Sequence, residues 1–439
     1  MKTAKFYTLG CKVNQYETQT IREEFQKIGF QESEDDKQAS VCVINTCTVT
    51  HRADRHSLYL IRRAYRENPE ARIIVTGCLT QFDADKIASI PGVTLIVKNE
   101  DKNRIIHLLD NLTSTREPIS KSRIPISESR IPIPDTRFGI TYFKNHSRAF
   151  LKVQDGCNYH CSYCKVRLVR GESRSRALSE IKKETAALVG NGYREIVLSG
   201  ICLGSYGNDF IPRLSLAKVI EELEGIQEGF RIRLSSIEVN DITEELIHVM
   251  AKSDRVCRHL HIPVQSGDEQ ILRRMNRSYS PDGYIRLISQ IRRRMPDVAI
   301  TTDVMVGFPG ETEKNFKNTV QLIKRIDPSR VHIFPYSKRL NTSAYSFGEF
   351  VPESRIKLRI ANLEKVAQTL YLAYCRRFIY QVCEVLVERL VEGTPDLWEG
   401  YTDNYIKVRV ESNLNLKKQI IHAKLKSVYK DFVLADVVC

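Results

Sequence analysis

The chain has 439 residues, of which 42% are hydrophobic and 27% charged, so its composition is that of a globular protein and not of a disordered one. No apolar run reaches the roughly 18 residues of a membrane span, and the first residues lack the apolar stretch of a secretory signal. We therefore expect a cytoplasmic protein. Stable disulfides are rare there, so some of the 12 cysteines are expected to serve metal binding or catalysis.

Basic residues outnumber acidic ones, 67 to 53, which gives a formal net charge of +14. Such an excess favours a polyanionic partner, and nucleic acid is the usual one. A solvated basic surface would give the same balance, so charge alone does not decide between the two.

The first region, residues 1–105, alternates strands with helices, which predicts an α/β domain on a parallel sheet. Its strand candidates are Lys5–Leu9, Val41–Asn45 and Arg72–Thr76. A cysteine follows each of these strands, and the three are Cys11, Cys47 and Cys78. Because parallel strands gather their carboxyl ends at one sheet edge, we expect these thiols to converge. Three unrelated buried cysteines are the alternative, and Cys42, inside a strand, is expected to be plain core.

Residues 106–144 are predicted to be a linker, since four prolines and a tandem Ser-Arg-Ile-Pro-Ile repeat exclude a continuous helix. Residues 145–372 contain six strand–helix units, which predict a complete or partial barrel with its chemistry in the loops after the strands. The strand candidates are Arg148–Gln154, Arg194–Ser199, Arg231–Ser235, His259–Val264, Ala299–Val304 and Arg330–Pro335.

Residues 373–439 are predicted to form a small β-barrel that binds RNA. Its five short strands are Cys383–Val391, Trp398–Tyr401, Tyr405–Val410, Lys418–Ser427 and Val433–Val438. Their local charge is nearly balanced, so charge does not by itself indicate RNA binding.

The strongest motif is Cys157-Asn-Tyr-His-Cys161-Ser-Tyr-Cys164, directly after the first barrel strand. Three thiolates on one tight loop can hold three irons of a 4Fe–4S cube and leave the fourth iron open. A zinc site is the alternative, with His160 as the fourth ligand, but this spacing and place favour the cluster.

This motif resembles that of the radical SAM superfamily, and the whole chain resembles its methylthiotransferases. The N-terminal domain matches through Gly10-Cys11-Lys-Val-Asn14, Asn45-Thr-Cys47 and Thr76-Gly-Cys78. The centre matches through Arg170-Gly171, Arg174-Ser-Arg176, Ser199-Gly200, Leu203-Gly204-Ser-Tyr-Gly207, Arg233-Leu-Ser-Ser-Ile-Glu238, Pro263-Val-Gln-Ser-Gly267 and Val306-Gly-Phe-Pro-Gly-Glu311. The last domain resembles a TRAM domain, so the expected fold is an N-terminal parallel α/β domain, a partial (β/α)6 radical SAM barrel and a TRAM β-barrel.

The stretch Leu9-Gly-Cys-Lys-Val-Asn-Gln-Tyr-Glu17 is similar to the MtaB-like branch, which modifies N6-threonylcarbamoyladenosine at position 37 of tRNA, beside the anticodon. The branch acting on isopentenylated adenosine usually has Gln-Met after this cysteine, and the branch acting on a ribosomal-protein aspartate has Pro-Lys. The chain also departs from the family, because Leu340-Asn-Thr-Ser343 stands where Pro-Gly-Thr-Pro is expected after the last barrel strand.

The resemblance implies two 4Fe–4S clusters and S-adenosyl-L-methionine (SAM) as cofactors. Cys157, Cys161 and Cys164 would hold the cluster that binds SAM. Cleavage of SAM would give a deoxyadenosyl radical that takes hydrogen from carbon 2 of the base. Cys11, Cys47 and Cys78 would hold the auxiliary cluster that carries the sulfur.

Weaker site candidates lie in loops after strands. Gly171, Gly200, Glu238 and Gln265 could contact SAM, or they could serve as turn and surface residues. Arg167, Arg170, Arg174 and Arg176 follow the cysteine motif and are predicted to hold tRNA phosphates. A second basic set, for which a solvated helix face is an equal alternative, is Arg52, Arg55, Arg62, Arg63 and Arg66.

The expected partners are a tRNA anticodon stem-loop, an electron donor such as flavodoxin or ferredoxin, and a sulfur source. Two other functions remain as alternatives. One is the same chemistry on isopentenyladenosine tRNA or on a ribosomal-protein aspartate, and the other is a non-catalytic iron–sulfur or zinc RNA-binding protein.

Overall fold

The computed structural model describes residues 2–114 and 139–438, and the predicted proline-rich repeat lies outside these residues. The chain divides into two compact units. Unit 1 covers Met1–Ile140, Gly156–Asn158 and Cys164–Glu172, and unit 2 covers the rest. No helix in the described part of the chain has the length and apolar character needed to cross a membrane.

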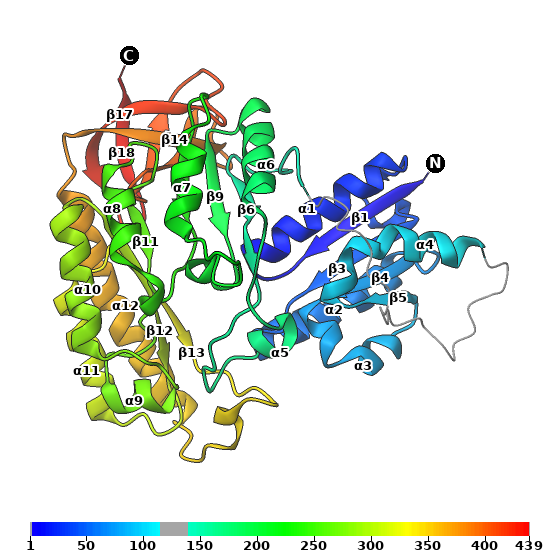
Figure 1. The fold of residues 1–439 in the computed structure, drawn as a ribbon, viewed down its shortest axis with the longest axis horizontal. Coiled ribbons are helices and arrows are strands. Elements are labelled where there is room, and N and C mark those ends of the chain that lie inside the picture. Colours follow the sequence, from blue (N-terminus) through cyan, green and yellow to red (C-terminus); the bar gives the residue numbers. More distant parts are fainter. Residues whose placement is uncertain (1, 115–138, 439) are drawn as a thin grey trace. The chain divides into compact units, whose positions relative to one another are not determined.

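Unit 1 is built on a five-stranded sheet in the order β2-β1-β3-β4-β5 (Figure 1). Its strands are β1 Thr3–Thr8, β2 Gln31–Glu32, β3 Val41–Thr46, β4 Arg72–Gly77 and β5 Val93–Val97. Every pairing in this sheet is parallel, as predicted from the alternation of strands and helices.

Helices cover both faces of this sheet (Figure 1). They are α1 Lys12–Lys27, α2 His51–Glu67, α3 Ala84–Ala88 and α4 Ile105–Ser114, with the 3-10 turns η1 Asp36–Gln38, η2 Cys78–Gln81 and η3 Asn99–Arg104. Neighbouring strand residues face opposite sides, so Ile74 packs in the core under α1 and α4, and Ile73 packs under α2 and α3. The sheet is therefore buried on both faces. A functional site can form where the strands end, at the carboxyl edge of the sheet.

Helix α4 corrects the predicted start of the linker at residue 106. It continues to Ser114 because Ile105 and Leu109 are buried in the core under α1, which stabilises a helix beyond the predicted boundary.

Unit 2 contains the six predicted barrel strands, β6 Ala149–Lys152, β9 Glu195–Ser199, β10 Arg231–Leu234, β11 His259–His261, β12 Ala299–Val306 and β13 Arg330–Pro335. They form two parallel sheets, β10-β9-β6 and β11-β12-β13, joined by a bridge between Ser236 and His261. A short antiparallel pair, β7 Gln154–Asp155 and β8 Arg174–Ser175, follows β6. The result is a six-stranded partial barrel, in agreement with the sequence.

Helices separate these strands. They are α6 Leu178–Gly190, α7 Leu216–Glu224, α8 Glu244–Lys252, α9 Glu269–Arg274, α10 Pro281–Arg294, α11 Glu313–Ile326 and α12 Glu353–Arg376, with the turns η4 Leu203–Ser205, η5 Val239–Asp241 and η6 Ser343–Ser346. Their starts follow from local sequence. Ser280 caps α10 with Pro281 at its first position, and Thr312 forms a capping box with Asn315 at α11.

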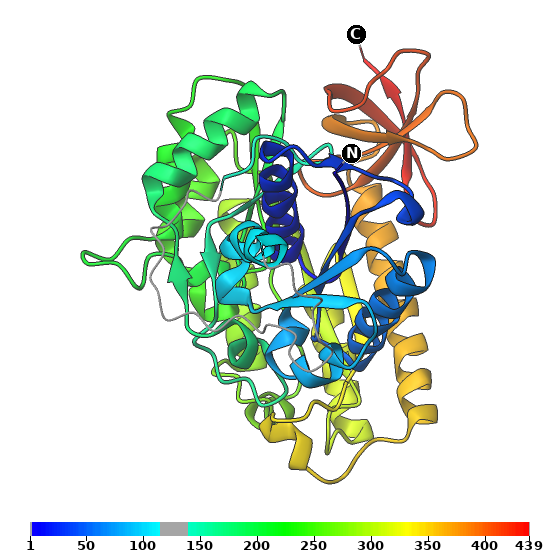
Figure 2. The same cartoon turned by 90° about the vertical axis from the view of Figure 1, so that its right-hand side faces the viewer.

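The chain ends in a closed barrel with the strand order β14-β15-β16-β18-β17, coloured orange to red in Figure 2. Its strands are β14 Val382–Leu390, β15 Leu397–Thr402, β16 Lys407–Glu411, β17 Ile420–Val428 and β18 Val433–Val437. All five strands predicted from the sequence are present, as in a TRAM-like domain. Helix α12 runs across the predicted boundary at residues 372 and 373 without a break.

The turn between β15 and β16 packs against the amino-terminal ends of the barrel strands. Arg233 donates to the Asp403 carbonyl at 2.9 Å, and the His259 ring stacks on Tyr405 at 4.4 Å. The buried Glu195 carboxylate holds Arg231 at 2.6 Å and Arg233 at 2.7 Å. This end of the barrel is therefore filled by structural contacts, which leaves the carboxyl ends of its strands for function.

Candidate functional site

Three cysteines lie at the carboxyl edge of the sheet in unit 1. Cys11 precedes α1, Cys47 directly follows β3, and Cys78 opens the turn η2 after β4. The turn before α1 approaches Cys47 closely, since a Cβ on Gly10 would meet the Cys47 Sγ at 2.9 Å. Gly10 also has φ +96°, so a residue without a side chain suits both its conformation and this contact.

The three thiols are near enough to influence one another. Burial raises the pKa of Cys47 to about 11, and the negative charges of Cys78 and Cys11 add to the rise. The structure thus brings together the three cysteines that the sequence predicted to converge, although 67 residues separate Cys11 from Cys78. Cys42 lies fully buried in the sheet core, as expected.

The spacing of these thiols argues against a single zinc ion. Within the described part of the chain, three ligand atoms fall within 4.8 Å of one another only in the set His261, Asp303 and His332. Four sulfurs around one zinc at about 2.3 Å lie about 3.8 Å apart, whereas each cysteine of an iron–sulfur cube binds a separate iron. The wider separation of Cys11, Cys47 and Cys78 therefore suits a cluster better than one zinc ion.

Polar atoms without a protein partner are buried at the same edge of unit 1. Asn45 and Thr76 each stand two residues before one of these cysteines, and both side chains are fully buried. The Asn45 Oδ1 and Thr76 Oγ1 atoms have no hydrogen-bond partner among the described residues. Orphaned buried polar atoms are rare in proteins, so their presence here fits a site that takes a bound group.

Arg170 is buried at this site and corrects one prediction. Only 3% of the residue is exposed, and its guanidinium bonds the Glu17 carboxylate at 2.6 and 3.1 Å. The same carboxylate pairs with the buried Lys102, and Arg170 also donates to the Asn14 side chain. Arg170 thus has internal anionic and polar partners and does not lie on an RNA-binding surface.

The motif segment after β6 is shared between the units, with Cys157 and Cys164 in unit 1 and Cys161 in unit 2. In unit 1, the Cys157 N–H donates to the Gly171 carbonyl at 3.1 Å. The Cys164 Sγ accepts from the Val166 N–H at 3.4 Å, at the start of α5 Val166–Arg170. Backbone donors that face a sulfur stabilise its thiolate form, which metal binding requires.

In unit 2, the residues after Cys161 are held by the chain around α9. The Ser162 N–H donates to the Met275 carbonyl at 3.0 Å, and its hydroxyl donates to the Arg274 carbonyl at 2.7 Å. Arg277 donates to the Tyr163 hydroxyl at 2.6 Å and forms an ion pair with Glu238. The cysteine segment is therefore fixed by neighbouring loops before any cofactor binds.

The residues predicted to contact SAM have different environments. Gly200, directly after β9, leaves no room for a side chain, because a Cβ would meet the Gln154 Oε1 at 2.8 Å. Glu238 already pairs with Arg277, and burial raises its pKa although the arginine opposes the rise. Gln265 is buried with φ +63°, and its Oε1 has no partner among the described residues.

This oxygen of Gln265 is a candidate acceptor for a bound molecule, because a buried oxygen without a protein partner is costly unless a ligand satisfies it. Gly171 lies in unit 1, at the end of α5, with φ +72°. The left-handed turn at the end of α5 therefore accounts for a glycine at this position.

Two groups were missed at the sequence level. Gln154 is fully buried and accepts from the Cys202 N–H at 2.8 Å, so it fixes the loop after β9. The second is the set His261, Asp303 and His332, on the same face of adjacent strands, where His261 Nε2 lies 3.2 Å from the Asp303 carboxylate. Polar residues spaced by two within a barrel strand are the signal that would have identified this set.

The remaining arginines divide into exposed and internal ones. Arg174 is exposed, and Arg167 is partly exposed with Glu172 at 3.9 Å. Arg176 is half-buried, pairs with the buried Glu184 at 2.8 Å and donates to the Lys152 carbonyl, so its guanidinium has partners within the protein. On α2 the residues Arg52, Arg55, Arg62 and Arg66 are exposed, while Arg63 pairs with Glu67 at 2.6 Å.

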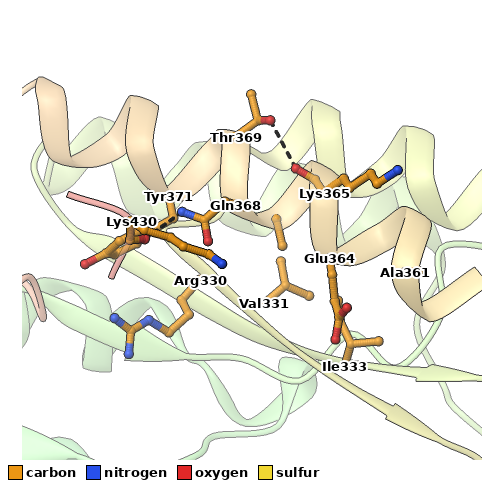
Figure 3. Close-up of a pocket in the computed structure, with 11 residues that line it drawn as sticks. Arg330, Val331, Ile333, Ala361, Glu364, Lys365, Gln368, Thr369, Tyr371 and Lys430 are labelled. Atoms are coloured by element: carbon orange, nitrogen blue, oxygen red, sulfur yellow. Dashed lines mark hydrogen bonds between the residues drawn. The ribbon is translucent and has the colours of Figure 1, made fainter. Parts of the chain in front are cut away.

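An open groove of about 800 Å³ runs between β13 and α12, with Lys430 at one end (Figure 3). Its cationic side chains are Arg330, Lys365 and Lys430, and Glu364 is the acidic one. Arg330 stacks on Tyr371 at 5.1 Å, and Gln368 donates to the Lys430 carbonyl at 2.7 Å. The groove includes none of the site residues predicted from the sequence, but its charge suits an anionic partner.

Comparison with known proteins covers nearly the whole chain. Residues 151–323 match the Radical SAM superfamily, and residues 3–98 match a family described as Uncharacterized protein family UPF0004. The Threonylcarbamoyladenosine tRNA methylthiotransferase MtaB of Bacillus subtilis (strain 168) is 39% identical over 97% of this chain and 94% of its own length. The protein of the same name from Thermotoga maritima is 37% identical over 93% of this chain and 91% of its own length.

A relative with another substrate in its name is slightly more distant. The tRNA-2-methylthio-N(6)-dimethylallyladenosine synthase of Clostridium tetani is 33% identical over 95% of this chain and 92% of its own length. Among solved structures, the radical S-adenosylmethionine methyltransferase TsrM from Kitasatospora setae superimposes with a TM-score of 0.55. That match covers 76% of this chain and 75% of TsrM at 14% identity, so it supports the fold alone.

Proposed function

The chain belongs to the tRNA methylthiotransferase family of the radical SAM superfamily, and from this premise we propose that it converts N6-threonylcarbamoyladenosine at position 37 of tRNA to its 2-methylthio derivative. The family's cofactors are 4Fe–4S clusters and SAM. Relatives named for threonylcarbamoyladenosine are 32% to 39% identical to this chain, and relatives named for dimethylallyladenosine are 31% to 33% identical. The higher identities in the first group favour threonylcarbamoyladenosine as the substrate.

The second set of cysteines is the observation that carries the proposal. An enzyme that only cleaves SAM needs one cluster with an open iron, and Cys157, Cys161 and Cys164 suffice to hold such a cluster. The additional convergence of Cys11, Cys47 and Cys78 at a sheet edge is what a sulfur-transferring enzyme requires. A non-catalytic RNA-binding protein has no need of two three-cysteine sets.

The roles of the chain's own residues follow from their places. Cys157, Cys161 and Cys164 would hold the cluster that binds SAM, and Cys11, Cys47 and Cys78 would hold the auxiliary cluster. When bound, these groups supply the radical that activates an inert aromatic C–H bond and the sulfur that replaces its hydrogen.

Around the two predicted cluster sites, other side chains hold the loops in place and pair with buried charges. Gln154 fixes the loop after β9, and Arg277 fixes Tyr163 within the motif segment. The buried Oε1 of Gln265 would be an acceptor for SAM when SAM is bound. Beside Cys11, Cys47 and Cys78, Arg170 and Lys102 both pair with Glu17, so this buried carboxylate has its counter-charge.

Binding of tRNA draws on exposed cations. The net charge of +14, the exposed Arg174 and the lysines of the groove in Figure 3 all suit phosphate contacts. The reaction also needs an electron donor such as flavodoxin or ferredoxin, and a sulfur source that restores the auxiliary cluster.

A competition experiment tests the substrate. Anaerobically reconstituted protein would receive SAM, a reductant and an equal mixture of two tRNAs, one bearing threonylcarbamoyladenosine and the other isopentenyladenosine. We expect methylthio product chiefly on the first. Product chiefly on the second would overturn the substrate assignment and keep the chemistry. A parallel reaction would contain ribosomal protein in place of the tRNAs, and a methylthio product there, with none on either tRNA, would overturn the tRNA assignment.

A further inference from the structure

The loop after β13 presents two aromatic rings on either side of a lysine. The Lys338 Nζ lies 4.5 Å from the centre of the Tyr345 ring and 4.4 Å from that of Phe350. Tyr345 is 40% exposed and Phe350 is 47% exposed. We call these three residues the aromatic platform.

The platform stands on an ordered base. Ala344 is fully buried in the small core with Phe308 and Met305, and Phe347 packs against the same core. The Tyr336 hydroxyl donates to the Ala344 carbonyl at 3.1 Å, and the Gly310 N–H donates to the Glu349 carbonyl at 3.0 Å. The exposed rings are therefore held in place before any partner arrives.

The loop after β13 forms a turn at the residues where this chain departs from the family sequence. Asn341, in the segment where the family's glycine is expected, adopts φ +68°, and asparagine is one of the few residues that tolerate this conformation. Thr342 closes the turn by donating from its N–H and its hydroxyl to the Arg339 carbonyl. The departure from the family sequence thus keeps a turn and leaves the platform exposed.

The platform's loop is bonded directly to the cysteine segment. The Ala344 N–H donates to the Ser162 carbonyl at 2.7 Å, and Ser162 directly follows Cys161. Tyr345 is the next residue after Ala344. A molecule that stacks on the platform is consequently held next to the segment that carries a cluster ligand.

We propose that the aromatic platform binds unpaired nucleobases of an RNA loop, with Tyr345 and Phe350 as stacking surfaces. This inference rests on the proposed function, because it names the part of the RNA that the site contacts. Exposed aromatic rings stack with bases of any sequence, and an interposed cation attracts the adjoining phosphates. Fully paired RNA offers no free base face and should not use the platform.

The test measures RNA affinity with the holoenzyme under anaerobic conditions. One probe is a synthetic RNA hairpin with an unpaired loop, and the other is the same stem as a continuous duplex. Tyr345→Leu and Phe350→Leu keep apolar bulk but lose the ring face. Base–aromatic stacking predicts a loss of roughly 5- to 150-fold in affinity for the hairpin per ring, with no change for the duplex.

Matched variants separate stacking from loop damage. Tyr345→Phe and Phe350→Tyr should retain hairpin affinity, and Leu340→Ala, at an exposed apolar residue of the same loop, should leave it unchanged. Melting temperatures should not move, since all these side chains are exposed. Unchanged hairpin affinity in both leucine variants would overturn the proposal, and so would equal losses for hairpin and duplex.

The same experiment distinguishes this inference from the proposed function. If the leucine variants lose hairpin affinity but the wild type makes no methylthio product on any tRNA, the platform stands and the proposed reaction fails. If the variants bind and modify tRNA as the wild type does, the reaction stands and the platform fails.

Discussion

Arg170 lies buried against Glu17, with its Nη1 atom 2.6 Å from the Glu17 Oε1. Arg170 ends the helix after the radical SAM motif, and Glu17 lies on the helix that follows Cys11, 153 residues away. Lys102 completes the group, so one carboxylate holds two cations in the interior of unit 1. The pair thus connects the segments that carry the two predicted cluster sites.

Removing one partner of this group should destabilise unit 1. Glu17→Gln leaves Arg170 and Lys102 buried without their carboxylate, and the loss of one partner of a buried pair costs about 3–5 kcal/mol. Denaturant unfolding should show this decrease in the free energy of unfolding. Arg63→Ala is the matched control, because its partly exposed pair with Glu67 should contribute less than about 1 kcal/mol. If the two variants lowered the free energy of unfolding equally, Glu17 would not be the stabilising counter-charge of Arg170 and Lys102.

Cys47→Ala should separate the two cluster functions. We expect the purified protein to lose about four iron atoms per chain and the methylthio product, while SAM is still cleaved to deoxyadenosine. Iron analysis and product analysis on the same preparation check this. Cys42→Ala, in the core of the strand that ends just before Cys47, should keep its full iron content. Full methylthio transfer by Cys47→Ala would remove this cysteine from the auxiliary site.

Glu195 should make stability depend on pH. Burial disfavours its charge, but Arg233, Arg231 and Arg148 hold the pKa of this carboxyl well below its usual range. The folded pKa is depressed, so the ion pair contributes stability above the unfolded value of about 4.3, and that contribution is lost as pH falls toward the folded pKa. Thermal melts from neutral to acidic pH should show the loss.

In Glu195→Gln the stability at neutral pH should fall by about 3–5 kcal/mol, because several buried guanidinium groups lose their counter-charge. This variant should also lose the part of the acid dependence that the wild type shows below about pH 5. Glu222, which pairs with Lys182 and Lys218 at the surface, provides the control. Its lysine partners also lower its pKa, but solvent screens this pair, so Glu222→Gln should change the acid dependence far less than Glu195→Gln does. An unchanged acid dependence in Glu195→Gln would contradict the argument.

The sheet edge and the barrel were predictable because they depend on local patterns. Strands β3 and β4 are short buried runs, and the cysteine directly after each one marks where it ends. The pairing of two arginines with acidic residues inside the protein could not be predicted from the sequence. Arg170 and Arg176 look like phosphate-binding residues beside the motif, and only the folded chain shows that Glu17 and Glu184 neutralise them.

The same holds for the aromatic platform and for the polar set on β11 to β13. Tyr345 and Phe350 meet around Lys338 through the shape of one loop, which no periodic pattern describes. His261, Asp303 and His332 become neighbours through the strand register, which fixes Asp303 opposite His332. Tertiary contacts of this kind are absent from the local sequence.

Exposed arginines should govern the salt dependence of tRNA binding. Arg174→Glu should weaken binding and flatten the slope of affinity against salt, since one phosphate contact is lost and a repulsive charge is gained. Titrations at several salt concentrations measure both effects. Lys183→Glu, at an exposed cation on α6, makes the same charge change away from the motif and should have a smaller effect. Identical slopes for Arg174→Glu and the wild type would remove Arg174 from the interface.

A nucleoside mass analysis measures the proposed reaction itself. Anaerobically reconstituted protein would be mixed with SAM, a reductant and tRNA bearing threonylcarbamoyladenosine, and the tRNA would then be digested. We expect this nucleoside to gain a methylthio group and SAM to be consumed. Unmodified threonylcarbamoyladenosine from fully iron-loaded protein that still cleaves SAM would contradict it.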